Sequence, residues 1–255
     1  MRVLIHGYGK VGQLVFKLLT EGRHEIMGVV SPNHTGANYD SIEEVDLDVI
    51  DVIIDFSTDE AFINMFEYVL KVNPKVRIVT GTSNWEQYAD TLKQKVLTNH
   101  MYFLYGANFS IGTALFMQLI SKASSIFNGF NDFDVSILDI HHRRKTDMPS
   151  GTAKTISNSI VQNMKRKERV LFGNSNEPVQ DNQLHVNCLR VGENKGFHEV
   201  IFDSANEVIK ISQQTLNREN YAHGSIMAAE WLFLMQEPGN YTFNQYISSI
   251  LNYNN

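Results

Sequence analysis

The chain has 255 residues, of which 43% are hydrophobic and 20% charged, and its formal net charge at pH 7 is -6. This composition is typical of a globular protein with one or two domains and excludes disordered and fibrous classes. The acidic balance argues against a nucleic-acid partner, because such proteins usually carry a basic surface. Cys188 is the single cysteine, which excludes an internal disulfide and a cysteine-based metal cluster.

The first residues of the chain do not have the pattern of a secretory signal peptide. Residues 1–9 enter a strand pattern at once and lack the apolar segment and cleavage site of a signal peptide. No hydrophobic run reaches the length of a membrane span. We therefore expect a cytoplasmic protein with no membrane partner.

The first hundred residues alternate short apolar runs with helical patterns, which indicates βαβ units and a parallel sheet. Predicted strands and helices alternate at 2–7, 12–22, 24–30, 51–56, 60–71, 77–82 and 101–109.

From Phe133 the pattern changes to longer strands with fewer helices, which predicts a mixed or antiparallel sheet. These strands cover 133–142, 183–191, 196–203 and 207–215. Residues 191–197, with Gly192 and Gly196, predict a hairpin turn between two of them. Residues 223–236 then form a helix too apolar to be exposed.

A glycine motif follows the first predicted strand. Gly7, Gly9 and Gly12 have the spacing G-x-G-x-x-G and open the first helix, where backbone N–H groups can approach a pyrophosphate. The motif alone is a weak signal, but its position in a βαβ pattern favours dinucleotide binding over an ordinary glycine-rich turn.

The sequence of the loop after the second predicted strand does not indicate whether the cofactor is NADH or NADPH. NAD sites usually have an acidic residue here and NADP sites an arginine, and residues 31–36 contain neither. Ser31 and Asn33 can bond a ribose hydroxyl and His34 can face a 2'-phosphate, although such residues are also ordinary turn formers. We expect NADH or NADPH with weak discrimination.

Residues 139–155 concentrate basic and proton-carrying side chains before a helix. His141 and His142 end a strand, Lys145 follows in a loop, and Ser150 is a good N-cap for a helix whose first turn holds Gly151 and Thr152. Its free N–H groups form a cradle for a carboxylate. Surface histidines and solvated basic runs are the ordinary alternative, which the clustering disfavours. No third ligand stands at a suggestive spacing, so we expect no metal.

The segment H-H-R-R-K-T-D-M-P-S-G-T-A at 141–153 resembles the signature of the dihydrodipicolinate reductases, also described as 4-hydroxy-tetrahydrodipicolinate reductases. Further landmarks of that family follow in order over nearly the whole chain. They are the glycine loop, 55–61, 80–83, 106–112, 189–200, 217–224 and 238–243.

The resemblance implies an α/β Rossmann-type nucleotide domain, residues 1–108 plus 218–255, and a second α+β domain on a mixed open sheet, residues 109–217. It implies reduction of a small cyclic dicarboxylate in lysine and diaminopimelate biosynthesis. His141 is then the proton donor and Lys145 a catalytic acid. His142, Ser150, Gly151 and Thr152 bind substrate. The implied cofactor residues are Gly7, Tyr8, Gly9, Lys10, Val11, Gly12, Asn33, Phe56, Ser57, Gly81, Thr82, Ser83, Gly106, Ala107, Asn108, Phe109 and Arg218.

The second domain also predicts self-association. Its long strands leave sheet edges and an open face in a single chain, and exposed apolar surface is normally covered by a partner. The resemblance implies a homotetramer. Two other functions remain open: a Rossmann dehydrogenase acting on another small acid, and a non-catalytic dinucleotide-sensing module. The presence of both His141 and Lys145 argues against the sensing module.

Overall fold

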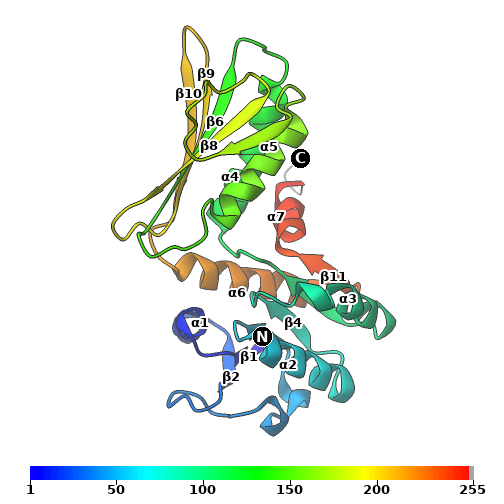
Figure 1. Cartoon of the computed structure of the whole chain (residues 1–255). Helices are drawn as coiled ribbons and strands as arrows, with labels where there is room; N and C mark the ends of the chain where they lie inside the picture. The colour runs from blue at the N-terminus through cyan, green and yellow to red at the C-terminus, as the bar shows by residue number, and fades with distance from the viewer. Residues whose placement is uncertain (253–255) are drawn as a thin grey trace. The chain divides into compact units, whose positions relative to one another are not determined.

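The computed structural model describes residues 1–252, so the last three residues of the predicted nucleotide domain lie outside the description. The chain forms two compact units (Figure 1). The first consists of Met1–Ile111 together with the segment that begins at Arg218, and the second of Gly112–Asn217.

The first unit contains a six-stranded sheet in the order β11-β5-β4-β3-β1-β2, with every neighbouring pair parallel. Its strands are β1 (Arg2–His6), β2 (Glu25–Val30), β3 (Val52–Asp55), β4 (Arg77–Thr80), β5 (Tyr102–Tyr105) and β11 (Gly239–Thr242). The order runs from β1 to β2 in one direction and continues from β3 in the other. The gap between β1 and β3 is therefore the switch point where such sheets bind ligands.

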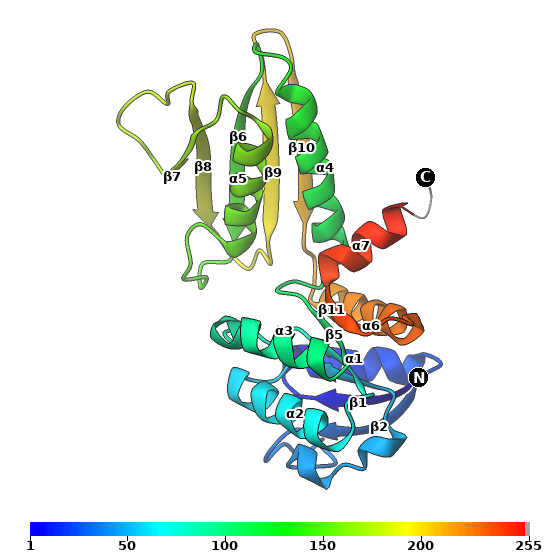
Figure 2. The same ribbon diagram turned by 90° about the vertical axis from the view of Figure 1, so that its right-hand side faces the viewer.

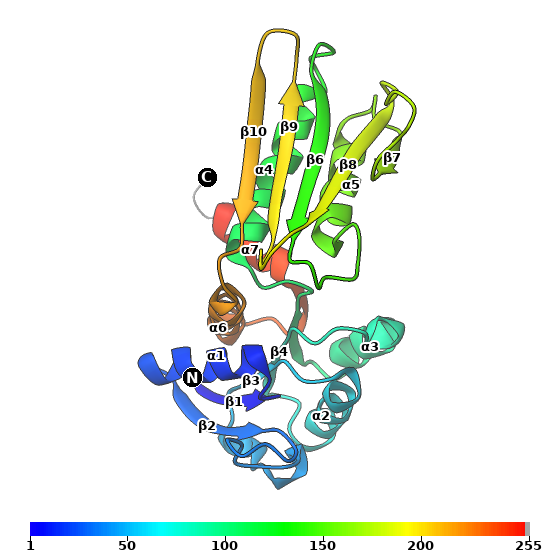
Figure 3. The same cartoon turned by 60° about the vertical axis from the view of Figure 1, so that its left-hand side comes forward.

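Helices cover both faces of this sheet, as is typical of strands buried on both sides. They are α1 (Lys10–Glu21), α2 (Asp59–Val72), α3 (Ala89–Thr98) and α6 (Glu219–Leu234), and a further helix, α7 (Phe243–Asn252), contacts β11 and α6. Apolar side chains of α2 and α3 join Leu4, Ile53 and Phe103 in one core. Helix α6 packs on α1 and on β3, β4 and β5 at the opposite face (Figure 3). Ala222, Ala228 and Leu232 of α6 are fully buried, which confirms that this helix is internal.

The second unit contains a five-stranded sheet in the order β10-β9-β6-β8-β7. Its elements are α4 (Ile111–Phe127), β6 (Asp134–His141), α5 (Gly151–Asn163), β7 (Arg169–Phe172), β8 (Gln183–Arg190), β9 (Phe197–Asp203) and β10 (Val208–Gln214). β8 pairs in parallel with β6 and with β7, whereas β9 pairs antiparallel with β6 and with β10. The sheet is therefore mixed, as predicted.

Helices α4 and α5 lie against one face of this sheet (Figure 2). The core consists of alternate strand residues, such as Val135 and Ile137 of β6, packed on apolar side chains of both helices. The intervening residues point to the other face, where Leu138 and Ile140 are half-buried.

The predicted hairpin at residues 191–197 is wrong. β8 and β9 do not pair with each other, because β6 lies between them and bonds to both. The connecting loop instead crosses the end of β6, where the Val191 N–H donates to the carbonyl of His141 at 2.9 Å.

Among residues 1–252, no helix is both long enough and apolar enough to cross a lipid bilayer.

Candidate active site

The glycine loop lies between the end of β1 and α1, at the switch point of the parallel sheet. Gly7 has a φ of +88°, and a Cβ there would stand 2.5 Å from the Phe56 carbonyl oxygen. A Cβ on Gly12 would stand 2.0 Å from the Gly7 carbonyl oxygen. Both positions therefore require glycine.

Gly9 differs from these two glycines because a Cβ there would meet no atom within 4 Å. It is the N-cap of α1 and its backbone faces open space beside the first-turn residues Lys10 and Val11. An approachable backbone at a helix N-terminus is what a pyrophosphate needs. These residues fit a dinucleotide.

Residues predicted to bind the cofactor follow the next three strands of the same sheet. Phe56 follows β3, Gly81 follows β4 and Phe109 lies in the segment after β5. The Phe56 ring packs edge-on against Phe109, with centroids 5.9 Å apart, and leaves no room for a side chain at Gly81. Because the strands are parallel, their carboxyl ends bring these residues to one edge of the sheet. The rest of the predicted set at this edge is Ser57, Thr82, Ser83, Gly106, Ala107 and Asn108.

A buried carboxylate not anticipated from the sequence lies beneath this edge. Asp55, at the end of β3, accepts hydrogen bonds from the hydroxyls of Ser57 (2.6 Å), Thr80 (2.6 Å) and Thr82 (2.8 Å). His6 Nδ1 lies 2.7 Å from the same carboxylate. The hydroxyl groups of Ser57 and Thr82, two predicted cofactor residues, therefore donate their hydrogen bonds to Asp55.

The connection after β2 contains a carboxylate, Asp40, seven residues after Asn33. Asn33 has a φ of +57°, and its N–H donates to Asp40 at 3.0 Å. The ring of His34 packs edge-on against Tyr8, with centroids 4.9 Å apart. Asp40 lies outside the residues 31–36 that the sequence pattern singled out. Arg218 is exposed and immediately precedes α6, whose residue Asn220 donates to Ser110 Oγ at 2.9 Å, next to the predicted cofactor residue Phe109.

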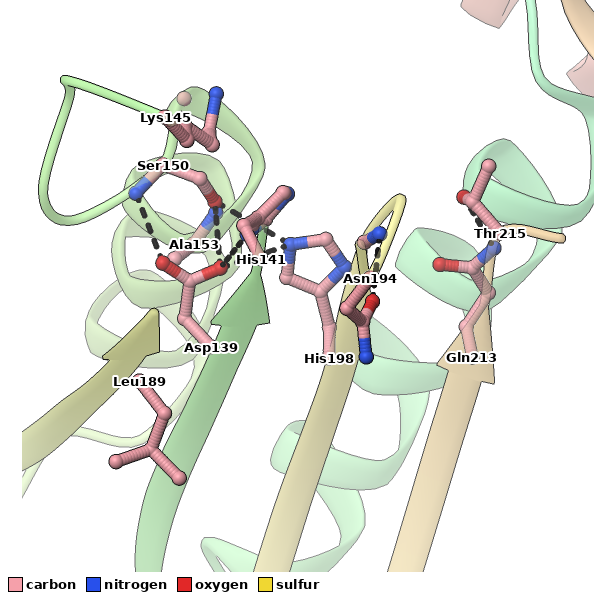
Figure 4. A network of polar contacts seen from close by, with 12 residues as sticks. Asp139, His141, Lys145, Ser150, Ala153, Leu189, Asn194, His198, Gln213 and Thr215 are labelled. Carbon is pink, nitrogen blue, oxygen red and sulfur yellow. Dashed lines mark hydrogen bonds and ion pairs between the residues drawn. The ribbon is translucent and has the colours of Figure 1, made fainter. Parts of the chain in front are cut away.

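In the second unit, His141 is the last residue of β6 and points to the helix-covered face. Asp139, two residues earlier, points the same way because strand side chains alternate. His141 Nδ1 lies 2.9 Å from Asp139 Oδ1, oblique to the N–H direction (Figure 4). The other ring nitrogen, Nε2, lies beside Gly196 in the loop that crosses the strand end, since a Cβ added to that glycine would be 3.2 Å from it.

Asp139 is the centre of a buried polar network. It is 0% exposed, yet Ser150 N–H and Oγ donate to it at 3.0 and 2.9 Å, and Arg190 Nη2 at 3.2 Å. His198 Nε2 lies 3.4 Å away. Burial alone would raise the pKa of Asp139, but the close contacts of His141 and His198 and the hydrogen bonds from Ser150 outweigh it and hold that pKa well below its ordinary value. The carboxylate is ionised.

Lys145 is paired with the aspartate of its own motif. Its Nζ lies 2.8 Å from Asp147 Oδ1, and its side chain is largely buried. Burial opposes ionisation of Asp147, and the bond from Lys145 outweighs it, so the pKa of Asp147 is lowered. Desolvation and the cations of Arg144 and Lys145 lower the pKa of His142, which favours its neutral form at pH 7.

Ser150 is the N-cap of α5, as predicted. Its Oγ accepts a hydrogen bond from the Ala153 N–H at 3.1 Å while donating to Asp139. The side chain is 2% exposed, so its polar atoms serve the interior. Gly151, by contrast, is exposed, and it forms the first turn with the half-buried Thr152. The backbone N–H of Gly151 bonds to the Asp147 carboxylate, as helix N-termini do with anions.

Asp139, His141 and His198 place ligand atoms within 4.8 Å of one another, which is close enough for a metal ion. The other partners of Asp139 argue against one. Both carboxylate oxygens already accept bonds from Ser150, and the Arg190 cation contacts one of them. A divalent cation would have to displace these donors beside a guanidinium, so the group does not fit a metal.

Sequence reasoning missed Asp139, Arg190 and His198. They occupy three neighbouring strands, β6, β8 and β9, and only the sheet register brings them together. The available signal was alternation, because Asp139 falls on the buried face two residues before His141.

Together the two units define a Rossmann-type oxidoreductase, with a dinucleotide site in one unit and proton-carrying side chains in the other. Family comparison makes the class specific. Residues 1–109 match the model of the N-terminal part of dihydrodipicolinate reductase and residues 112–247 that of its C-terminal part. The chain belongs to the dihydrodipicolinate reductase family, which confirms the resemblance carried by its motifs.

Individual relatives agree over nearly the full length. The 4-hydroxy-tetrahydrodipicolinate reductase of Caldanaerobacter subterraneus is 33% identical over 97% of this chain and 98% of its own. That of Christiangramia forsetii is 30% identical over 98% and 99%. A solved structure of dipicolinate-bound dihydrodipicolinate reductase from Paenisporosarcina sp. TG-14 superposes with a TM-score of 0.76 over 95% of this chain and 97% of its own, at 21% identity. This likeness confirms the predicted fold class.

Proposed function

We propose that this chain reduces 4-hydroxy-tetrahydrodipicolinate to tetrahydrodipicolinate with NADH or NADPH, a step in lysine and diaminopimelate biosynthesis. The observation that carries the proposal is the arrangement around α5 of the second unit. His141, Lys145 and the first turn of α5 belong to one motif, and the network of Asp139 connects the strand end to the helix.

The substrate is a small cyclic dicarboxylate. One carboxylate binds at the N–H groups of Gly151 and Thr152, where the helix dipole favours an anion. His142, neutral at pH 7, is a hydrogen-bonding partner for the same molecule. The dipicolinate named for the Paenisporosarcina relative is an aromatic dicarboxylate of this class.

The chemistry divides between the cofactor and the protein. The 4-hydroxyl group of the substrate leaves as water, which gives a conjugated imine. The nicotinamide, when bound, would supply a hydride to the ring carbon conjugated with that imine, and electron density then moves toward the ring nitrogen. His141 gives the proton that the resulting enamine requires. Lys145 supplies a cation where negative charge develops and acts as a second acid. Ion pairing with Asp147 fixes the Lys145 ammonium in the meantime.

The proposal is tested with purified protein, NADH or NADPH and freshly generated substrate, by following nicotinamide absorbance. We expect His141→Gln and Lys145→Ala each to lower kcat by about a hundredfold or more, as expected for general-acid and charge-stabilising groups. Arg169→Gln, at an exposed position of β7, serves as the control. Absence of oxidation by the wild-type protein would refute the function, and near-normal kcat in either variant would remove that residue from the mechanism.

Two alternative functions give different results in the same assay. A dehydrogenase for another small acid would oxidise the nicotinamide only with that acid. A dinucleotide-sensing module would bind the cofactor and turn over none of the substrates.

We propose weak discrimination between the two cofactors. Residues 31–36 contain no arginine for a 2'-phosphate and no carboxylate for the ribose hydroxyls, and Asp40 is bonded to the Asn33 backbone. We expect the two kcat/KM values to differ by less than about thirtyfold, or about 2 kcal/mol. Steady-state kinetics with each cofactor decides this, and a preference beyond about a thousandfold would place the selecting residue elsewhere.

We also propose that the chain assembles as a homotetramer and is located in the cytoplasm. The face of the second sheet opposite α4 and α5 carries half-buried apolar side chains, including Leu138 and Ile201, and its cover is a second copy of the chain.

A further inference from the structure

Asp139, Asp55 and Lys167 are buried charged groups of the described residues that the mechanism leaves unused, and Asp139 is the one that contacts the proposed proton donor. Asp139 is fully buried, and its carboxylate contacts the proposed proton donor and the residue that caps the proposed carboxylate cradle. A buried ionised carboxylate is costly unless every oxygen is paired. A hydrophobic side chain would serve the fold at this strand position as Ile137 does two residues earlier.

We propose that Asp139 is a positioning residue that holds the His141 imidazole and the N-terminus of α5 in one fixed relation. Proton donation and binding of the substrate carboxylate are then coupled through one side chain. This inference rests on the proposed function.

The first link runs from Asp139 to His141. A carboxylate 2.9 Å from Nδ1 favours the tautomer with its proton on Nδ1, and it stabilises the positive ring when a second proton is bound. Nε2 is then the nitrogen that exchanges a proton with the substrate. Nδ1 approaches the carboxylate obliquely, and catalytic hydrogen bonds of this kind often align fully only in the substrate complex.

The second link runs from Asp139 to the helix. Ser150 donates both its N–H and its hydroxyl to the carboxylate, and the hydroxyl oxygen caps the Ala153 N–H. With Ser150 directed inward, the N–H groups of Gly151 and Thr152 are the donors of the cradle, and the Gly151 N–H already bonds to a carboxylate, that of Asp147. Removal of the charge on Asp139 loosens the capping residue and with it the cradle.

The groups around Asp139 come from every element packed against it. They are His141 on its own strand, Arg190 and Cys188 on β8, His198 on β9 and Ser150 at the start of α5. Arg190 neutralises the charge permanently, because a guanidinium stays protonated. His198 Nε2 is 3.3 Å from Ser150 Oγ, and the His198 and His141 rings lie 5.3 Å apart, so His198 borders both links.

The test uses the full chain and Asp139→Asn, which keeps the shape and removes the charge. Asp203→Asn, at an exposed position of β9, is the matched control. We expect Asp139→Asn to lower kcat at least tenfold, to shift the alkaline limb of the kcat–pH profile to lower pH, and to raise the Kd for dipicolinate at least threefold. An unchanged profile and an unchanged Kd would overturn the proposal.

A double-mutant cycle separates positioning from general destabilisation. In a His141→Gln background the kcat loss from Asp139→Asn should disappear, because that loss acts through His141, whereas the rise in Kd should remain. An equal kcat loss in both backgrounds would show that Asp139 acts independently of His141 and would overturn the first link. Asp139→Glu should not restore either property, since the longer side chain displaces both partners in a buried site.

A measurement on the wild-type chain covers the case in which Asp139→Asn fails to fold. ¹⁵N NMR of histidine-labelled protein reports the tautomer of each neutral ring, and His141→Gln identifies the signals of His141. We expect the Nδ1–H form for His141, and the Nε2–H form would overturn the proposal. This result is independent of turnover, so loss of the proposed function and loss of the positioning role are distinguishable.

Discussion

His141 and Lys145 are four residues apart, and each contacts a different carboxylate. Asp139 lies at 2.9 Å from the histidine and Asp147 at 2.8 Å from the lysine. The two pairs have different consequences. The first is buried and belongs to a network that orients a ring, whereas Asp147 is half exposed and its pair is more open to exchange with a substrate carboxylate.

The sequence predicted those residues whose role depends on local chemistry. The N-cap role of Ser150 was predictable because a cap involves only the next few residues of the chain. The glycine loop after β1 was predictable because its motif is a spacing of neighbouring residues. Asp139, Arg190 and His198 meet only through the pairing of β6 with β8 and β9. Nothing in the sequence of any single strand specifies that pairing, so the network could not be predicted.

Cys188 provides a prediction about the charge of this network. Burial, and then the charge of Asp139, raise the pKa of Cys188 to about 11. The thiolate is the reactive form, so iodoacetamide at pH 8 should alkylate the folded chain about a hundredfold more slowly than a free cysteine. The rate should rise about tenfold per pH unit up to that value, because a raised pKa delays formation of the thiolate.

The same chain unfolded in guanidinium is the control and should react as an ordinary cysteine. Since Cys188 is the single cysteine, mass spectrometry of the intact chain reports the reaction without ambiguity. Rapid alkylation of the folded protein at pH 8 would show that the thiol is neither buried nor beside a negative charge.

At the scale of elements, the alternating pattern predicted the parallel sheet correctly and failed at the connection from β8 to β9. Two apolar strands joined by six residues with two glycines have the local signature of a hairpin. The strand that separates them, β6, ends at His141, more than forty residues before β8 begins. A rule based on neighbouring strands cannot detect such an insertion, which here places a loop over the proposed proton donor.

Two glycines in helices provide a prediction at this scale. A Cβ on Gly224 of α6 would stand 1.9 Å from the Phe109 carbonyl oxygen, whereas a Cβ on Gly112 of α4 would meet nothing within 4 Å. We expect Gly224→Ala to destabilise the protein by about 2 kcal/mol or more, because backbone has to move. Gly112→Ala, the matched control, should be neutral or stabilising by up to about 1 kcal/mol.

Thermal unfolding followed by circular dichroism measures both variants. A midpoint for Gly224→Ala equal to that of the wild type would show that α6 can move away from the segment after β5 without cost.

At the scale of the whole molecule, the first unit is built from both ends of the chain. Helix α6 packs against α1, and β11 completes the sheet beside β5. The apolar character of residues 223–236 predicted that this helix is buried, but its partner came only from the family resemblance. A hydrophobic helix specifies that it must be covered and leaves open which element covers it.

The last prediction concerns assembly. In β9, Val200 and Phe202 point into the helix-covered core, so Ile201 between them points to the other face of the sheet. If this face packs against a second copy, a lysine at position 201 places an unpaired charge in the interface. We expect the wild type to have four times the mass of one chain by light scattering, and Ile201→Lys to have a smaller mass. Leu119→Lys is the matched control because Leu119 is 59% exposed on α4, which covers the opposite face. A wild-type monomer at micromolar concentration would refute the tetramer, and an Ile201→Lys tetramer would place its interface on another surface.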